Sequence, residues 1–259
     1  MFRYYDIGVN LFCEQFHDPE QILSDAAEAG VGCILTGSSM SENRQIDAFV
    51  RTHEAWGTCG IHPHGASRMR PEDLGEMERI LTENDRVLAV GECGLDYDRM
   101  FSPMDVQRQV LEAHIALAER LGKPMFLHER EAAADMTAIF REHPDVCRRS
   151  VIHCFTGGRE TLETYLEMGF MIGITGWICD DRRAAALREA VAVLPPDRLM
   201  IETDCPYLTP RGIKGLRHTN VPGNVRYVAQ ALAKWCGMEE DALVCSAREN
   251  TLRFFGISV

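Results

Sequence analysis

Short apolar runs alternate with longer amphipathic stretches along the 259 residues of this chain. The short runs are rich in β-forming residues and are bounded by turn residues, which favours buried strands. Predicted strands cover residues 4–9, 32–36, 57–61, 87–91, 124–128, 150–154, 170–174 and 198–203. The stretches between them have the apolar period of helices. Predicted helices cover residues 19–29, 41–54, 72–84, 103–121, 131–142, 158–167, 181–193, 222–236 and 239–249.

Residues that begin and end helices support this division of the chain. Ser41, Ser102-Pro103 and Asp180-Asp181 are predicted to start helices, because short polar side chains and proline are common there. Gly30, Gly122 and Gly169 are predicted to end helices, since glycine readily takes the left-handed backbone that such positions need.

Strand–helix units in regular succession, with nearly continuous apolar strands, indicate a parallel sheet with both faces covered. Eight such units predict a (β/α)₈ barrel, and residues 1–259 are expected to form one domain because no linker or repeat interrupts them. An open doubly wound sheet is the alternative. Its usual glycine-rich turn after the first strand is missing, since "DIGVN" does not fit G-x-G-x-x-G.

Composition adds limits to this architecture. A hydrophobic content of 46% with 25% charged residues is typical of a globular protein with a large core. The first residues lack a signal-peptide pattern and no apolar run is long enough to cross a membrane, so a cytoplasmic location is expected. Ten cysteines without a C-x-x-C pair are expected to be reduced, which argues against a zinc ribbon.

The formal net charge of −12 argues against binding nucleic acid by general phosphate neutralisation. Attraction for an anionic substrate must therefore be local. The segment 210–222 reverses the sign of the charge with Arg211, Lys214, Arg217 and His218. It is either an ordinary solvated loop or, given its place after the last strand, a contact for an anionic substrate.

Polar residues gather where the predicted strands end, the position of catalytic residues in (β/α)₈ barrels. They are Asp6 and Asn10 with the first strand, His62 and His64 after the third, Glu92 and Asp96 after the fourth, His128 on the fifth, His153 on the sixth, and Glu202 and Asp204 after the eighth.

Glu92, His128, His153 and Asp204 form the predicted metal site. Carboxylates and imidazoles suit Mg²⁺, Mn²⁺ or Zn²⁺, and a cation would offset the cost of burying the carboxylates. Each residue alone has an ordinary structural alternative, such as a hydrogen-bonded core histidine or a turn-capping aspartate. Their coincidence at the ends of four strands favours the metal site.

The remaining candidates are less tightly defined. His62 and His64 flank Pro63 on a loop, where each is either solvent-facing or a hydrogen-bond donor to a substrate phosphate. Asp96 either fixes its loop or contacts substrate. Histidines within or beside helices are predicted to be surface residues without a functional role: His17, His53, His114 and His143.

Several motifs together carry a family resemblance: "GIHPH", "GECGLDY", "LHER", "IHCFTG", "GITGW" and "ETDCPYL". From about residue 5 to 256 the chain resembles the TatD family of metal-dependent deoxyribonucleases. The resemblance implies an amidohydrolase-like TIM barrel that uses Mg²⁺ to remove nucleotides from the 3′ end of single-stranded DNA or RNA, with a role in repair of oxidised DNA. It places the metal ligands on Glu92, His128, His153 and Asp204, a substrate contact on His64 and the family's loop aspartate on Asp96.

The chain departs from the family pattern at two places. Gly8 and Asn10 stand where many relatives have the two histidines of D-x-H-x-H, so one tightly held metal is expected rather than two. "TNVP" at 219–222 replaces the usual "RNEP", so Arg217 or His218 is expected to take over substrate positioning there.

The predicted activity is phosphodiester hydrolysis, with Asp204 and Glu92 as catalytic residues. Predicted substrate contacts are His62, His64, Asp96, Arg211, Arg217 and His218. The expected partner is a single-stranded nucleic acid, without a membrane or an obligate protein partner, and the chain is expected to be a monomer. One alternative is a small-molecule amidohydrolase with the same metal site, and another is a barrel that binds metal or nucleic acid without catalysis.

Overall fold

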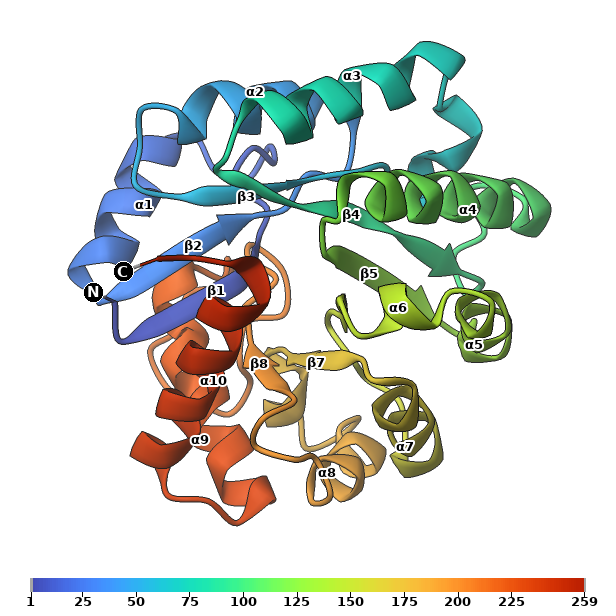
Figure 1. The fold of residues 1–259 in the computed structure, drawn as a ribbon. Helices are drawn as coiled ribbons and strands as arrows, with labels where there is room; N and C mark the ends of the chain where they lie inside the picture. The colour runs from blue at the N-terminus through green and yellow to red at the C-terminus, as the bar shows by residue number, and fades with distance from the viewer. Residues whose placement is uncertain (1, 259) are drawn as a thin grey trace. The chain divides into compact units, whose positions relative to one another are not determined.

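The computed structural model describes residues 2–258 and divides into two compact units. Unit 1 takes in the chain up to Leu35, then Cys154–Leu166, and the chain from Met171 onward. Unit 2 takes in Thr36–His153 and Glu167–Phe170. Figure 1 shows the elements coloured along the chain. The expectation of a single domain stays a prediction.

Unit 1 is built on four parallel strands. β1 pairs with β2, β7 pairs with β8, and a parallel bridge from Val9 to Cys205 joins the end of β1 to the chain after β8. Its elements are β1 (Tyr4–Val9), α1 (Pro19–Glu28), β2 (Val31–Leu35), most of α7 (Arg159–Met168), β7 (Met171–Ile174), the 3₁₀ turn η2 (Gly176–Cys179), α8 (Ala185–Val191), β8 (Leu199–Ile201), the 3₁₀ turn η3 (Pro222–Asn224), α9 (Val225–Cys236) and α10 (Glu240–Phe255).

Unit 2 holds the other four strands, which pair in parallel in the order β3-β4-β5-β6. Its elements are α2 (Met40–Val50), β3 (Trp56–Cys59), the 3₁₀ turn η1 (Pro63–Arg68), α3 (Pro71–Glu83), β4 (Val87–Asp96), α4 (Met104–Leu121), β5 (Met125–Arg130), α5 (Ala133–Arg141), the short α6 (Pro144–Cys147) and β6 (Ser150–Ile152).

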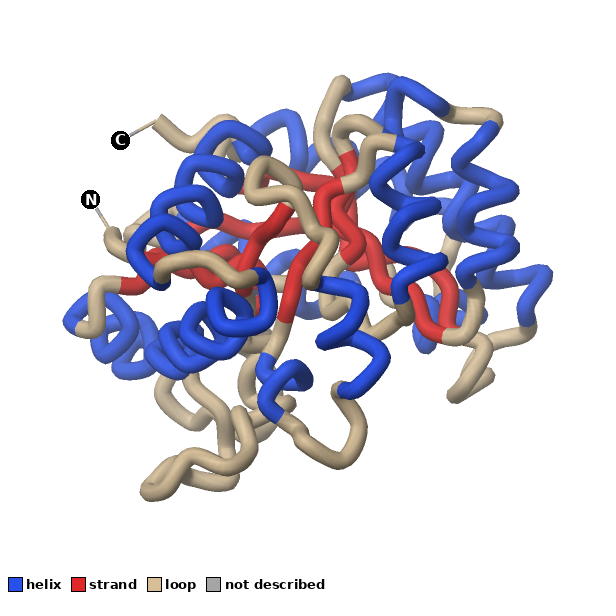
Figure 2. Tube along the Cα trace, turned by 90° about the horizontal axis from the view of Figure 1, so that it is seen from below, coloured by secondary structure: helices blue, strands red, loops and turns tan. Residues whose placement is uncertain are grey.

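The strand order, β1 to β8 in one parallel sheet, is the order of the predicted (β/α)₈ barrel. Figure 2 shows the alternation of strands and helices along the trace. β1, β2, β4 and β6 to β8 are buried at every residue, as strands covered on both faces should be. The continuous apolar runs in the sequence therefore follow directly from the architecture.

The main differences from the predicted elements lie at their ends. β4 continues to Asp96, so Glu92 is inside the strand rather than at its end. Ser39, not Ser41, caps α2 by accepting a hydrogen bond from the Glu42 amide. α8 begins at Ala185 rather than near Asp181, because η2 and a turn occupy the residues before it.

The three glycines predicted to end helices have the expected left-handed backbone. Gly30, Gly122 and Gly169 have φ values of 73°, 66° and 96°. No described helix is both long and apolar enough to span a membrane. All ten cysteines are free thiols, as the sequence predicts.

Candidate metal centre

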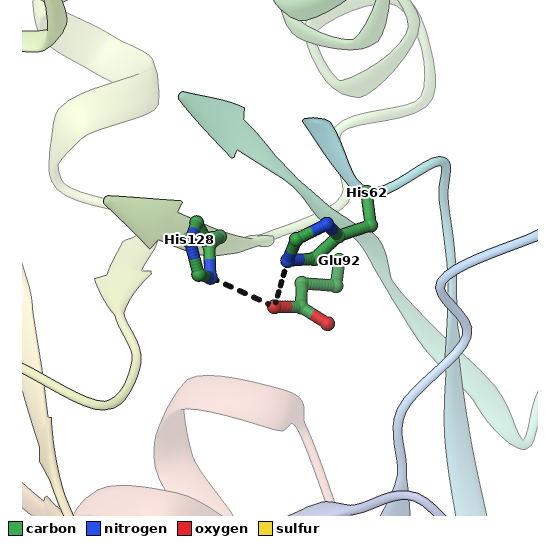
Figure 3. A group of neighbouring side chains, drawn as sticks. All are labelled: His62, Glu92 and His128. Carbon is green, nitrogen blue, oxygen red and sulfur yellow. Dashed lines mark hydrogen bonds and ion pairs between the residues drawn. The ribbon is translucent and has the colours of Figure 1, made fainter. Parts of the chain in front are cut away.

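Glu92 of β4 is the centre of a cluster of histidines in unit 2. Its Oε1 lies 2.8 Å from His153 Nε2, 3.2 Å from His128 Nδ1 and 3.3 Å from His62 Nε2. Figure 3 shows the His62 and His128 rings converging on this oxygen. The Glu92 amide donates to Gly37 O over 2.7 Å, which fixes the backbone below the carboxylate.

Glycine at position 91 lets β4 approach β5 at this point. Gly91 has a φ of 133°, and a β-carbon there would overlap the backbone carbonyl of Phe126 on β5. Any other residue would push the strands apart or strain the backbone. The glycine therefore allows Glu92 and His128 to come from adjacent strands at hydrogen-bonding distance.

The electrostatics of the cluster keep Glu92 charged. Burial alone would raise the pKa of Glu92, but the nearby His62, His153 and His128 lower it well below its usual value. Burial lowers the pKa of His62. Burial would also lower the pKa of His128, yet hydrogen bonding to Asp96 and Glu92 raises it. The result is a charged Glu92 carboxylate surrounded by imidazoles, of which His128 favours its protonated form.

The hydrogen bonds of His62 define its chemical role. Its Nδ1 accepts the His64 amide hydrogen over 3.1 Å, so the ring proton must sit on Nε2. That Nε2 faces Glu92 Oε1. A protonated nitrogen has no lone pair to give a metal, although the atoms offered by His62, Glu92 and His128 lie within 4.8 Å of one another. The arrangement makes His62 a hydrogen-bond donor and leaves His128 and His153 as the candidate imidazole ligands.

His128 links Glu92 to a second carboxylate, that of Asp96. Its Nε2 lies 3.3 Å from Asp96 Oδ2, and its Nδ1 lies 3.2 Å from Glu92 Oε1. The ring therefore presents Nδ1 to the Glu92 carboxylate and Nε2 to Asp96. Two imidazoles and a carboxylate are a donor set that divalent cations accept. The residues present therefore fit a metal.

Asp96 also holds His64, which adds a further histidine to the same cluster. His64 Nε2 lies 2.7 Å from Asp96 Oδ2, while Asp96 Oδ1 accepts the amide hydrogens of Asp98 and Arg99. Burial opposes the charged form of Asp96, but His128 and His64 outweigh it and lower the pKa. Asp96 thus shapes the loop after β4, as one of its two predicted roles requires, and orients two histidines, while its predicted contact with substrate stays a prediction.

His114 is a functional support that the sequence prediction missed. It was predicted to be a surface residue, but it is fully buried in α4. Its Nδ1 donates to Val110 O over 2.7 Å and its Nε2 accepts the Ile61 amide hydrogen over 3.1 Å. Because Ile61 precedes His62, this neutral histidine anchors the start of the loop that carries two cluster residues. The sequence did contain a signal for this burial, because His114 lies on the apolar face of α4 together with Leu111, Ile115 and Ala118.

Asp204 lies in unit 1, after β8. Its φ of 55° places it in the left-handed region, and its Oδ1 accepts a hydrogen bond from Asn10 Nδ2 over 2.9 Å. Asn10 Nδ2 also donates to Cys205 O over 3.1 Å. The amide nitrogen of Asn10 thereby orients the Asp204 carboxylate. Membership of Asp204 in the metal site stays a prediction.

Asp6 and Glu202 are further buried acids of unit 1. Asp6 Oδ1 accepts the Thr203 amide over 2.8 Å, and burial raises the pKa of Asp6 to about 8. Glu202 Oε1 accepts the Cys154 amide over 2.5 Å. A β-carbon on Gly8 would overlap Glu202 Oε2. The Glu202 carboxylate therefore fills the space that a side chain at position 8 would need, which explains the glycine there.

The basic side chains of the predicted segment are exposed and lie in unit 1: Arg211, Lys214, Arg217 and His218. Arg211 Nε pairs with Asp180 Oδ2 over 3.2 Å, and Arg182 and Arg183 pair with the same carboxylate. The Arg183 guanidinium lies 4.0 Å from the Trp177 ring centroid. Three arginines on one nearly buried carboxylate leave a local excess of positive charge, as the sequence suggested.

Other residues of this segment have defined backbone partners. The His218 carbonyl accepts from Thr209 Oγ1 over 2.7 Å, whereas the Arg217 side chain is exposed. Asn220, in the altered "TNVP", is buried and donates to Thr203 O and Tyr207 O. This asparagine anchors the segment to the residues around Asp204.

The comparisons with known proteins decide the family. The model of the TatD related DNase family matches residues 5–256. The chain belongs to this family. A curated 3′-5′ ssDNA/RNA exonuclease TatD from Pantoea ananatis is 40% identical over 259 residues, covering 98% of this chain and 99% of that protein. The corresponding exonuclease of Citrobacter rodentium is 39% identical and covers 98% of each chain.

Solved structures agree with the family and the fold. YjjV, a TatD homologue from Escherichia coli, has a TM-score of 0.91 and 26% identity over 99% of both chains. The phosphotriesterase homology protein of Escherichia coli, solved with phosphate in its active site, has a TM-score of 0.68 at 14% identity and supports the fold alone. This TatD-family chain therefore has the predicted (β/α)₈ barrel fold and is a hydrolase that acts on phosphodiester bonds.

Proposed function

We propose that this TatD-family chain is a 3′–5′ exonuclease of single-stranded DNA or RNA that depends on one divalent cation, Mg²⁺, with Mn²⁺ or Zn²⁺ as alternatives. The observation that carries the proposal is the convergence of three histidines on Glu92 Oε1. Relatives 39–40% identical along nearly the whole chain are curated as exonucleases of this kind. Glu92, His128 and His153 would hold the cation, with Asp204 as the fourth ligand that the family resemblance implies.

A cation in this position would act as a Lewis acid on a phosphate oxygen and would lower the pKa of a bound water. The protein's own residues supply the rest. Asp204, whose carboxylate is oriented by Asn10, would accept a proton from the attacking water. Glu92 keeps its negative charge because its surrounding histidines stabilise it.

Hydrogen-bond donors would stabilise the charge that develops on the substrate phosphate. The hydrogen bond from the His64 amide to His62 Nδ1 leaves the proton on Nε2, which would donate to a phosphate oxygen beside Glu92. His64, held by Asp96, is a second donor. Arg211, Arg217 and His218 would attract the strand through charge, since all three are exposed.

The small-molecule amidohydrolase alternative has less support. Such enzymes commonly use two metals held in part by an H-x-H pair, and here Gly8 lacks a side chain while Asn10 is bonded to Asp204. A non-catalytic barrel is disfavoured by the intact histidine cluster. The repair role, the cytoplasmic location and the monomeric state remain proposals from the sequence.

The test uses three kinds of oligonucleotide labelled at the 5′ end: single strands, duplexes with a single-stranded 3′ tail, and blunt duplexes. We expect a ladder that shortens from the 3′ end with Mg²⁺ or Mn²⁺, little product from blunt duplex, and none with a chelator. His128→Ala and Asp204→Asn should each reduce the rate at least ~100-fold. Matched controls are His143→Ala and Asp241→Asn, at sites away from the cluster. Wild-type rates in the first two variants would refute the assignment.

A further inference from the structure

Unit 2 carries an exposed apolar cluster in the loop after β4. The side chain of Phe101 is 65% exposed, and Met100 and Met104 are each 41% exposed. Single exposed apolar residues are common on protein surfaces, but three within five positions form a local patch. The patch occurs in a chain whose formal net charge is −12.

The backbone on both sides of Phe101 is held firmly. Ser102 is fully buried, its Oγ accepts the Ser67 amide over 3.1 Å, and its carbonyl accepts from Gln107 Nε2 over 2.8 Å. On the other side, Asp96 Oδ1 accepts the amides of Asp98 and Arg99. The aromatic ring is therefore presented to solvent by a fixed loop, which reduces the entropy lost when a ligand packs on it.

The ring also stands next to the catalytic cluster. The Phe101 and His64 ring centroids are 4.7 Å apart with an interplanar angle of 80°. His64 is bonded to Asp96, and Asp96 lies 3.3 Å from His128 Nε2. A group that packs on the exposed part of Phe101 would consequently lie beside the proposed site of hydrolysis.

The chemistry of the patch indicates which part of a substrate it takes. A nucleic acid offers phosphates, sugars and planar bases, and only the bases gain from contact with an aromatic ring and methionine side chains. Stacking on a protein ring requires a base that has left its own duplex stack. A stacking residue beside the cleavage site would thus favour unpaired ends.

We propose that Phe101 is a stacking platform for the base of the nucleotide at the 3′ end of a single strand, with Met100 and Met104 beside it. This inference rests on the proposed function. His64 packs against the ring in a T-shaped contact, and the exposed part of the ring receives the base. The platform positions the terminal nucleotide so that its phosphodiester faces the Glu92 cluster. It contributes to single-strand preference and to substrate affinity rather than to the chemical step.

The first experiment measures stacking without cleavage. A single-stranded oligonucleotide carries 2-aminopurine at its 3′ end or, in a second probe, ten nucleotides inward, and is bound in the presence of a chelator. We expect the wild type and Phe101→Tyr to change the fluorescence of the terminal probe several-fold more than that of the inner probe. Phe101→Ala should abolish this difference, while the matched aromatic variant Trp235→Ala, in α9, should keep it. An unchanged terminal signal in Phe101→Ala would overturn the proposal.

The second experiment uses cleavage with Mn²⁺ and compares a normal 3′ end with one whose last nucleotide lacks its base. Removal of the ring should raise KM for the normal end ~10-fold with little change in kcat. For the wild type, removal of the terminal base should raise KM by a similar factor. On this base-free substrate, Phe101→Ala should raise KM no further. Equal losses on both substrates would assign the ring a purely structural role and contradict the platform.

The two experiments separate this proposal from the proposed function. Terminal-probe stacking in chelator supports the platform even if the wild type fails to shorten the strand, a result that would refute the exonuclease assignment alone. A second copy of this chain is the other ligand that could pack on the patch, and sedimentation velocity tests whether the chain dimerises. A wild-type dimer that Phe101→Ala converts to monomer would overturn the proposal.

Discussion

Asn10, the residue after β1, donates a hydrogen bond over 2.9 Å to Asp204, in the turn that follows β8. The family resemblance leads one to expect a histidine at position 10, and an amide that orients a carboxylate stands there. Asp204 needs such support because its φ of 55° lies in a region that non-glycine residues seldom occupy. The departure at position 10 therefore has a positive structural role.

Asn10→Ala should lower kcat for single-stranded DNA ~10-fold, because Asp204 loses its fixed orientation, and should change KM little. Asn10→Asp should have a larger effect, since a second carboxylate would face Asp204 across the same distance. Steady-state kinetics with Mn²⁺ measure both. Asn10→Ala with wild-type kcat would show that the hydrogen bond has no catalytic importance.

Gly8→Ala should reduce the free energy of unfolding by ~1–3 kcal/mol, because the new methyl group would overlap the Glu202 carboxylate. Gly75→Ala is the matched control. Gly75 lies inside α3, and a β-carbon there has nothing within 4 Å, so this variant should be more stable by ~0.5–1 kcal/mol. Urea unfolding with chelator present distinguishes the two. Equal stability of both variants would contradict the contact between Gly8 and Glu202.

Stability should depend on pH through His114. Burial lowers the pKa of His114 from 6.5 to about 4, so the unfolded chain takes up a proton at a higher pH than the folded one. This histidine's contribution is complete above pH 6.5 and is lost as the pH falls toward 4, amounting to about 3 kcal/mol. His114→Gln can still accept from the Ile61 amide but cannot titrate, so its urea midpoint should fall less between pH 7 and 5. His53→Gln, at a partly exposed site, is the control.

Metal binding should release protons, since the pKa of His128 is raised and a ligand imidazole must be neutral. Affinity for Mn²⁺ is thus expected to fall as the pH is lowered. Calorimetry in buffers of different ionisation enthalpy measures the protons released per metal bound. His128→Ala should bind Mn²⁺ at least ~10-fold more weakly and release fewer protons. The same release from wild type and His128→Ala would assign the titrating group elsewhere.

Arg211→Ala should weaken binding of single-stranded DNA severalfold and reduce the slope of log K against log salt by about 0.7, the value for one single-strand phosphate contact. Arg3→Ala provides the comparison. Arg3 is an exposed arginine of the same unit, paired with Asp241. It lies just before the first residue of β1, whereas catalytic residues in this fold lie at the carboxyl ends of the strands. Anisotropy titrations in chelator at several salt concentrations give both slopes. Identical slopes for wild type and Arg211→Ala would remove this arginine from the nucleic-acid interface.

The order and type of the elements could be predicted because buried parallel strands leave a strong apolar pattern in the sequence. Their ends could not, because hydrogen bonds made far along the chain decide them. β4 extends to Asp96 since it pairs with β5 as far as Arg130, and no local signal in "GECGLD" marks this extension. α8 starts late because Asp180 is occupied by three arginines instead of capping a helix.

Within the site, residue types at strand ends predicted Glu92, His128 and His153, and these do lie together. The role of His62 could not be predicted, since it depends on which ring nitrogen accepts the His64 amide. His114 was missed for a related reason. A histidine on a helix is usually exposed, and only the three-dimensional path of the chain brings the Ile61 amide to its ring.

Three imidazoles around one buried carboxylate have a consequence for the empty enzyme. When the cation is removed, protons on the rings can balance the charge of Glu92, so the interior is never left with a bare anion. Metal-free protein is therefore expected to stay folded, and addition of the ion should restore the site without refolding.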